Sequence, residues 1–181
     1  MSTSFSSPQQ SAFRVRRTVG FLDLSGFTKF SNEFGDDAAV EQLAIFRSIV
    51  RHTGAGGGVR VAKWLGDGAM FGGSNAASVI AVLLRVMHRV RSKGLLEVHG
   101  GVTTGDVIFF EGDDYIGSSV NLAARLADRA IPGQLLGPVS ILPGLAGSDA
   151  VIGSVVVPSF GEAIEVADLC KAARLVESLN L

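Results

Sequence analysis

The stretch TVGFLDLSGFTKF, at residues 18–30, decides the architecture of the chain. Residues 18–24 form a short apolar run with β-branched and aromatic members, interrupted by one aspartate, which is typical of a buried strand. Ser-Gly then predicts a turn. From Thr28 to about His52, apolar residues recur at helical spacing, and Gly35-Asp36 is expected to divide this helix into two pieces. The side chains expected to face the core are those of Phe30, Phe34, Val40, Leu43, Ile45, Phe46 and Ile49.

The later segments alternate between strands and helices. Two apolar runs, 59–65 and 69–71, surround Gly66-Asp67-Gly68 and predict a β-hairpin with Asp67 at its tip. The further predicted elements are a helix at 76–91, two strands at 98–104 and 105–110, a helix at 119–130, and short strands with turns after it. This order predicts an α+β fold, a ferredoxin-like sandwich derived from a βαββαβ unit, with helices packed on a mostly antiparallel sheet.

The bulk composition indicates one domain. We interpret residues 1–14 as a disordered tail that lacks the apolar run of a signal peptide, and 15–181 as the domain. Lysine plus arginine (16) nearly balances aspartate plus glutamate (17), which favours neither nucleic acid nor an anionic membrane as a partner. Prolines and glycines interrupt the nearly uncharged stretch 130–161, so no membrane span is predicted. The single cysteine, Cys170, indicates a reducing compartment such as the cytoplasm.

Two aspartates stand out by their position. Asp23 interrupts an apolar strand, where an unpaired carboxylate would be costly to desolvate. It can cap the following helix or pair with a buried arginine, and Asp67 can be an ordinary turn residue. Taken together, two carboxylates at strand ends match the way Mg²⁺ is held in proteins, with water and substrate phosphate completing the octahedron.

Four other polar residues are candidates for ligand binding. Lys63 lies in an apolar strand, where it is either an edge-strand lysine with a solvated head or a binding group. Asn121 and Arg125 share one face of a predicted helix, and Asp114 lies in the turn before it. An asparagine and an arginine at this spacing are, on their own, most often a solvated helix face.

Three ordered blocks make the chain similar to a known family. They are FLDLSGFTKFS at 21–31, KWLGDGAMF at 63–71 and GVTTGDVIFFEGDDYIGSSVNLAARL at 101–126. In order and separation they resemble the class III adenylyl and guanylyl cyclase catalytic domain, over roughly residues 15–170. The resemblance implies an adenylyl-type, bacterial homodimeric enzyme that converts ATP to 3′,5′-cyclic AMP and pyrophosphate.

The resemblance implies a metal site and a phosphate site. Asp23 and Asp67, with the backbone carbonyl of Leu24, would hold two Mg²⁺ or Mn²⁺ ions for two-metal-ion catalysis. The backbone N–H groups of Phe27 and Thr28, at the start of a helix, would bind phosphate oxygens of the substrate.

The resemblance also assigns the other four polar residues. Lys63 and Asp114 would select the base, Asn121 would orient the ribose, and Arg125 would stabilise charge on the α-phosphate. Lysine can donate to the adenine N1 acceptor and aspartate can accept from the N6 amine, whereas guanine reverses both groups, so this pair favours ATP over GTP.

In this family each site is shared between two subunits, which implies a homodimer with two composite sites. One departure from the family concerns the triphosphate. Phe160-Gly161 stands where many members carry a lysine before a glycine, and Arg47, Arg51 and Arg129 are the arginines that can replace it. The alternatives to an adenylate cyclase are a guanylate cyclase and a catalytically silent cyclase-fold module that binds nucleotide and dimerises.

Overall fold

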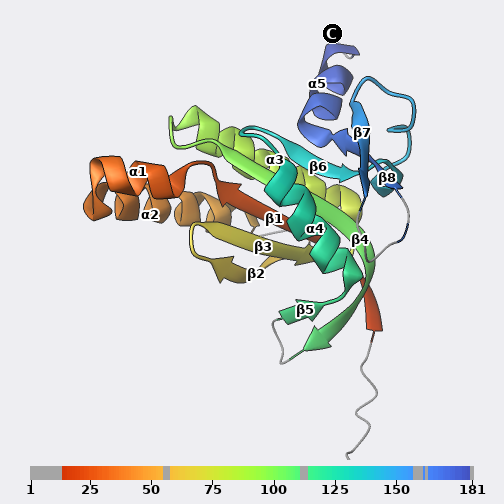
Figure 1. Ribbon diagram of the computed structural model, residues 1–181, viewed down its shortest axis with the longest axis horizontal. Helices are drawn as coiled ribbons and strands as arrows, with labels where there is room; N and C mark the ends of the chain where they lie inside the picture. Colours follow the sequence, from red (N-terminus) through yellow and green to blue (C-terminus); the bar gives the residue numbers. More distant parts are fainter. Residues whose placement is uncertain (1–13, 55–57, 111–113, 157–160, 162, 180–181) are drawn as a thin grey trace, which may run out of the picture.

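A mixed sheet forms the centre of the molecule (Figure 1). The computed structural model describes residues 14–54, 58–110, 114–156, 161 and 163–179. The strands are β1 (Arg14–Leu24), β2 (Val59–Leu65), β3 (Gly68–Gly73), β4 (Val98–Phe110), β5 (Asp114–Ile116), β6 (Leu135–Pro138), β7 (Val151–Val156) and β8 (Ala163–Asp168). Their order in the sheet is β2-β3-β1-β4-β6-β8-β7, and β5 pairs with β4 outside this path. The pair β4 and β6 is parallel and the other recorded pairs are antiparallel.

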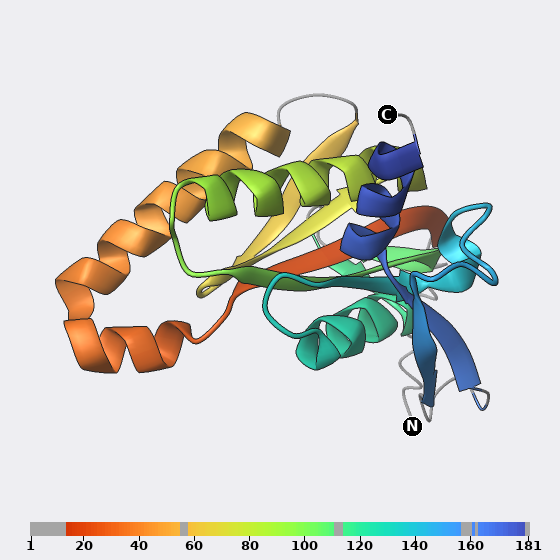
Figure 2. The ribbon, with the colours of Figure 1, turned by 90° about the horizontal axis from the view of Figure 1, so that it is seen from above.

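Helices cover both faces of the sheet (Figure 2). On one face lie α2 (Asp36–Gly54), α3 (Ala76–Ser92) and α5 (Leu169–Leu179), and on the other lies α4 (Ser118–Arg129). A short helix, α1 (Phe27–Phe34), precedes α2, and a 3-10 turn, η1 (Val139–Ile141), follows β6. The predicted α+β sandwich with a mostly antiparallel sheet is therefore confirmed.

The largest apolar core lies between the sheet and the α2, α3 side. Phe46 of α2, Phe71 of β3 and Leu83 of α3 are fully buried in it. On the other face α4 packs closely on β4, because Gly101 has no side chain; a Cβ there would meet backbone atoms of Ala123 and Ala127. A second core, which includes Leu122 and Leu126, forms beneath α4. The sequence places glycine where helix and strand approach each other most closely.

Several predicted elements have the expected bounds. The 28–52 segment is divided at Gly35, which has φ 87°, and the hairpin of β2 and β3 turns at Gly66 and Asp67. The α3 helix begins at Ala76, where the Asn75 side chain caps it by accepting a hydrogen bond from Ser78 N at 2.9 Å.

Other predictions were wrong. Residues 98–110 form one continuous strand and not two, because Gly105 lies within the ladder opposite Arg17 instead of in a turn. Phe34 and Val40 are 60% and 65% exposed, so they do not face the core. The α1 helix buries none of its residues, since it extends from the end of the sheet and not across it (Figure 1).

Two more differences concern Asp114 and the carboxyl-terminal region. Asp114 opens the short strand β5 instead of lying in a turn, because residues 114–116 pair with the end of β4. The α5 helix was not predicted. The proposed tail at residues 1–14 lies outside the described residues except for Arg14, which begins β1.

Candidate active site

Asp23 lies near the end of β1, between two neighbouring strands. It pairs with Gly68 of β3 on one side and with His99 of β4 on the other. Its side chain lies over Gly68, where a Cβ would come 2.6 Å from Asp23 Oδ1. Glycine at position 68 thus leaves room for the carboxylate, and the same β-hairpin carries Asp67 in its turn.

The charge of Asp23 is not compensated within the described residues. Burial, the nearby carboxylate of Asp67 and that of Asp128, in this order, raise the pKa of Asp23 from 3.8 to about 6. No ion pair of Asp23 is found in the described part of the chain. Converging carboxylates that repel one another are suited to a divalent cation, which would remove the repulsion.

A metal site here would be incomplete on protein ligands alone. Among the described residues, no three His, Cys, Asp or Glu side chains converge as a group able to hold a metal ion. Two carboxylates and a backbone carbonyl such as that of Leu24 nevertheless fit Mg²⁺, which keeps several waters and binds substrate phosphate. The donor set fits an ion shared with a phosphorylated ligand.

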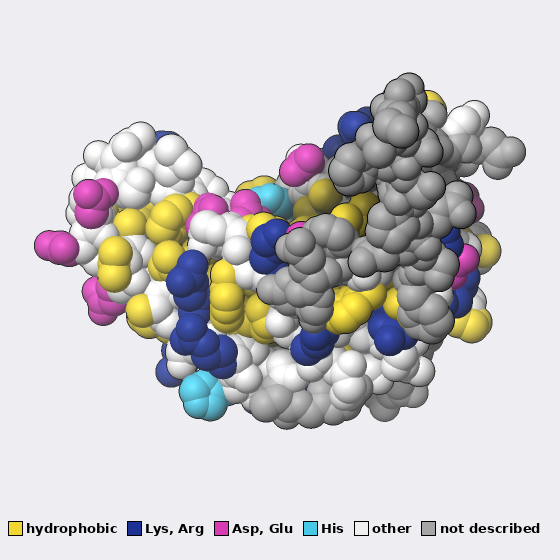
Figure 3. Space-filling model, turned by 90° about the horizontal axis from the view of Figure 1, so that it is seen from below, with side chains coloured by type: hydrophobic (Ala, Val, Ile, Leu, Met, Phe, Trp, Pro, Cys, Tyr) yellow, Lys and Arg dark blue, Asp and Glu magenta, His cyan; other side chains and the backbone are white. Residues whose placement is uncertain are grey.

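A small hollow opens beside Asp23. Its volume is about 210 Å³, and its lining includes Asp23, Leu65, His99 and Asp128. Figure 3 shows acidic side chains and a histidine gathered in a depression of the surface. Burial lowers the pKa of His99, while Asp128 and Asp67 oppose this shift, so the histidine tends to be neutral.

The turn after β1 is fixed by two hydrogen bonds. Ser25 N donates to Glu97 O at 2.7 Å, and Ser25 Oγ shares a hydrogen bond of 2.9 Å with His99 Nδ1. Gly26 then adopts φ 74°, and α1 begins at Phe27 with no side-chain cap. The first N–H groups of a helix, including those of Phe27 and Thr28, have no partner within the helix. They are available to an anion next to Asp23.

Lys63 and Asp114 are in direct contact. Lys63 Nζ donates to Asp114 Oδ2 at 2.9 Å, and Tyr115 N donates to Asp114 Oδ1 at 3.1 Å. The hydrogen bond from Lys63 is the main reason that the pKa of Asp114 is lowered. The ion pair between Lys63 and Asp114 thus joins β2 to β5. It holds Asp114 as an ionised hydrogen-bond acceptor beside a cationic hydrogen-bond donor.

A second bridge holds the same two strands together. Arg60 of β2 donates to the Tyr115 hydroxyl through Nη2 at 2.9 Å and Nε at 3.2 Å. Its guanidinium also lies 5.2 Å from the ring centroid of Phe109 and 5.3 Å from that of Tyr115. Tyr115 is only 5% exposed, and Gly72 makes room for its ring. Arg60 and Tyr115 therefore position Asp114, and sequence reasoning missed them because their contact joins residues far apart in the chain.

Arg47 supports the turn that carries Asp67. Its Nη2 donates to Gly66 O at 3.0 Å, and its guanidinium lies 5.1 Å from the ring centroid of Trp64. Arg51 lies 5.3 Å from the same centroid. Both arginines are thus engaged with β2 and its turn, which makes them positioning residues in this structure.

Asn121 and Arg125 lie on α4, as predicted, and are exposed. Together with Lys63 and Asp114, they are absent from the lining of the hollow beside Asp23. These four residues and Asp23 therefore do not line one cavity in a single chain, although Ala124, Ala127 and Asp128 of α4 do line the hollow. Phe160, the departure at the triphosphate position, lies outside the described residues.

Comparison with solved structures identifies this arrangement. The crystal structure of the adenylyl cyclase CyaB from P. aeruginosa matches with a TM-score of 0.66 and 25% identity, covering 86% of this chain and 94% of that one. The chain has the fold of class III nucleotide cyclase domains. The guanylyl cyclase Cya2 shares this cyclase fold, with a TM-score of 0.65 and 23% identity over 87% of this chain and 92% of that one.

Sequence relatives agree with the cyclase fold. An adenylate cyclase of Streptomyces coelicolor is 31% identical over 116 residues, which are 64% of this chain and 30% of the relative. The cyclase domain thus spans about a third of the length of the curated relatives it matches. No protein-family model matches the chain. Within the described residues of this cyclase domain, every helix is too short or too polar to cross a membrane.

Proposed function

We propose that this domain is an adenylate cyclase, which converts ATP to 3′,5′-cyclic AMP and pyrophosphate. The observation that carries the proposal is the carboxylate of Asp23, which lines a hollow, has no ion-pair partner among the described residues and is repelled by the nearby carboxylate of Asp67. Such a corner attracts a divalent cation and the phosphates that accompany it.

The metal-binding residues in this proposal are Asp23, Asp67 and the carbonyl of Leu24. Two bound Mg²⁺ or Mn²⁺ ions would lower the pKa of the ribose 3′-hydroxyl and offset charge on the phosphates. The protein contributes position: Gly68 fixes the space around Asp23, and Arg47 holds the turn that presents Asp67. The backbone N–H groups of Phe27 and Thr28 would bind phosphate oxygens.

The base site in this proposal is the Lys63 and Asp114 pair. Lysine has three donors and a carboxylate has about four lone-pair sites, so each group can contact the base and keep its partner. Because the pKa of Asp114 is lowered, it is an acceptor at neutral pH and suits the adenine N6 amine. Lys63 would donate to N1. Guanine presents a donor and an acceptor in the opposite places, which makes GTP the poorer substrate.

The reacting phosphate would be held by α4. Arg125 carries a permanent positive charge and would meet the extra charge that develops on the α-phosphate, while Asn121, one turn earlier, would orient the ribose. Both side chains are exposed, so they can reach a ligand outside their own chain.

A homodimer would complete the site. The hollow beside Asp23 has about 210 Å³, below the range of about 300–1,000 Å³ that is usual for small-molecule sites. The base and phosphate residues do not line it, so a second copy of the chain is needed to bring them to Asp23. Apolar side chains around the proposed interface support this, since Leu65, Phe109 and Ile116 are 40%, 41% and 48% exposed.

A nucleotide assay tests the proposal. Purified protein incubated with Mn²⁺ and ATP should release cyclic AMP and pyrophosphate, and GTP should be a poorer substrate. In the double variant Lys63→Glu, Asp114→Cys, the ratio of kcat/KM for ATP to that for GTP should fall by roughly tenfold or more, because each base contact contributes about 1–3 kcal/mol of discrimination.

The controls separate selectivity from folding. The variant Lys171→Gln, an exposed site on α5, should keep the wild-type ratio. An unchanged ratio in the double variant would remove the base-recognition argument. A confirmed dimer that forms no cyclic product from either nucleotide would instead identify a silent cyclase-fold module.

A further inference from the structure

A second cavity lies on the opposite side of the molecule from α4. It is a groove of about 780 Å³ between α3 and α5, which also reaches the residues just before and at the start of β4. Figure 2 shows α3 and α5 on the face of the sheet that α4 does not cover. The groove shares no lining residue with the hollow beside Asp23, although its residue Glu97 accepts a hydrogen bond from Ser25 N in the turn after β1. Its volume is within the range of small-molecule sites, about 300–1,000 Å³.

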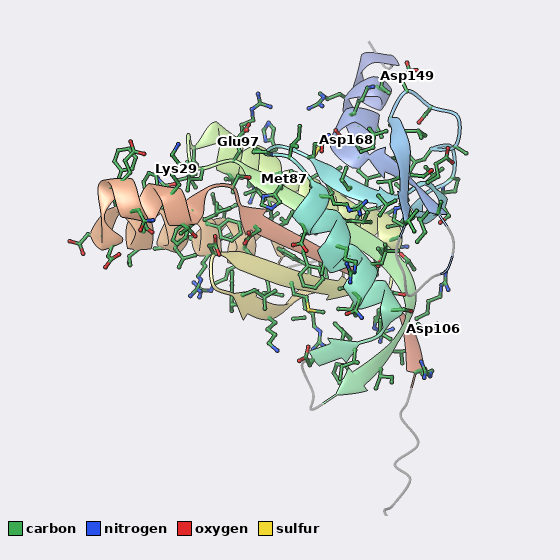
Figure 4. The ribbon with its side chains drawn as sticks, viewed as in Figure 1. Lys29, Met87, Glu97, Asp106, Asp149 and Asp168 are labelled. Carbon is green, nitrogen blue, oxygen red and sulfur yellow. The ribbon has the colours of Figure 1, made fainter. Side chains whose placement is uncertain are left out.

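The floor of this groove is apolar. Met87 of α3 and Val98 of β4 are 7% and 3% exposed, and Leu84 and Ala173 are half-buried beside them. At the floor, the Cys170 thiol of α5 lies 3.9 Å from the sulfur of Met87 of α3. This contact joins the two helices. Met87 and the rim residue Glu97 are both labelled in Figure 4.

The rim of the groove is basic. Four exposed arginines and one histidine line it, against a single acid, Glu97; the basic residues are Arg85, His88, Arg89, Arg91 and Arg174. Arg89 donates to Thr53 Oγ1 at 3.0 Å. Among the described residues, none of the four arginines forms an ion pair. Like charges held around an apolar floor favour a ligand that carries negative charge on an apolar body.

We propose that the groove between α3 and α5 binds a small organic anion, with its apolar body on the floor and its carboxylate, sulfonate or phosphate among the arginines. Arginine suits these groups because its planar fork can donate two parallel hydrogen bonds to them. The size of the groove and its buried floor favour a small molecule over an acidic protein segment. This proposal does not depend on the cyclase activity.

Cys170 allows a direct test, because it is the single cysteine of the chain and it lines the groove. Burial raises the pKa of this thiol to about 11, so modification is slow and easily timed. Two methanethiosulfonate reagents of similar size would be compared, one with a sulfonatoethyl group and one with a trimethylammonioethyl group. Each reagent's rate with Cys170 is first divided by its rate with a small free thiol, which corrects for intrinsic reactivity. The ratio of the two corrected rates does not depend on the thiolate fraction of Cys170 and reports the charge preference of the groove.

We expect the anionic reagent to be favoured by about tenfold, as electrostatic focusing raises the local concentration of anions. The double variant Arg85→Gln, Arg174→Gln removes two of the four arginines and should lower the ratio clearly toward one. Lys171→Gln is the matched control, because Lys171 is an exposed cation on the same helix but does not line the groove. It should leave the ratio unchanged. A ratio near one in the wild-type protein would overturn the proposal without any variant.

Occupancy is tested by protection of Cys170. The anion 8-anilinonaphthalene-1-sulfonate should slow modification by neutral methyl methanethiosulfonate, and the uncharged N-phenyl-1-naphthylamine should protect far less. Protection should be lost in the double arginine variant. Equal protection by both compounds would mean that the groove binds apolar compounds whatever their charge. Protection by an acidic helical peptide alone would indicate a protein partner. Either result contradicts a small-anion site.

Discussion

Replacing Asp23 with asparagine should abolish product formation and at the same time stabilise the metal-free protein. Activity should fall on the order of 10³-fold, because the neutral amide is a poor ligand for the cations on which the proposed reaction depends. Stability should rise because the carboxylate is half-buried near Asp67 and Asp128 and is costly to ionise. The two effects have opposite signs, which an ordinary structural defect would not produce.

The stability gain depends on pH in a defined direction. The pKa of Asp23 is about 6 in the folded protein and 3.8 when unperturbed, so the folded state binds a proton more tightly than the unfolded state. Above pH 6 the ionised carboxylate destabilises the fold, and well below pH 3.8 both states are protonated and the effect vanishes. Because the group is half-exposed, we expect a gain of about 1 kcal/mol above pH 6, or about 2–4 °C in Tm.

Thermal unfolding without metal, at pH 4 and pH 8, measures this prediction. The Asp23→Asn protein should have a higher Tm than wild type at pH 8, and this difference should be much smaller at pH 4. Added Mn²⁺ should raise the Tm of the wild type but not that of the variant. Asp149→Asn, at an exposed loop position, is the control and should match wild type throughout. An Asp23→Asn protein that is less stable at pH 8 would contradict the account of this carboxylate.

Replacing Arg125 with alanine should lower kcat on the order of 10³-fold, with a much smaller change in KM. The reason is that the proposed role of the guanidinium is to meet charge that develops in the transition state and not in bound ATP. Arg125 is exposed, so its removal should leave the free energy of unfolding within about 0.5 kcal/mol of wild type.

The control for Arg125 is an exposed arginine outside the proposed site. Arg16 of β1 is exposed, and Arg16→Ala should retain wild-type kcat. Initial rates at saturating and limiting ATP separate the two kinetic constants. If KM rises and kcat is unchanged, Arg125 contributes to substrate binding only, and its assignment to the transition state is wrong.

The sequence was sufficient for the elements whose signals are local. The turn at Gly66 and Asp67, the break at Gly35 and the amphipathic helix α3 each follow from a few adjacent residues, and the structure has them at the expected places. The single strand β4 was missed because Gly105 has the composition of a turn. Tertiary packing accounts for glycine at position 105, because a side chain there would meet Ser119 of α4.

The contacts that shape the candidate site were not predictable in the same way. The Arg60 bridge to Tyr115 and the Arg47 bond to Gly66 join residues on different elements. No local pattern marks them. Exposure of Phe34 also escaped prediction, because helical periodicity defines an apolar face but not whether the sheet extends far enough to cover it.

Mixing two inactive variants tests the central claim, a site built from two copies of the chain, most directly. Asp23→Asn and Arg125→Ala proteins would be allowed to exchange subunits, and cyclic AMP formation would be compared with each variant alone. Half of the dimers are then mixed, and each mixed dimer has one intact site of two, so activity should recover to about a quarter of wild type. If exchange is demonstrated and the mixture stays at the sum of the two separate variants, the site is not shared between chains.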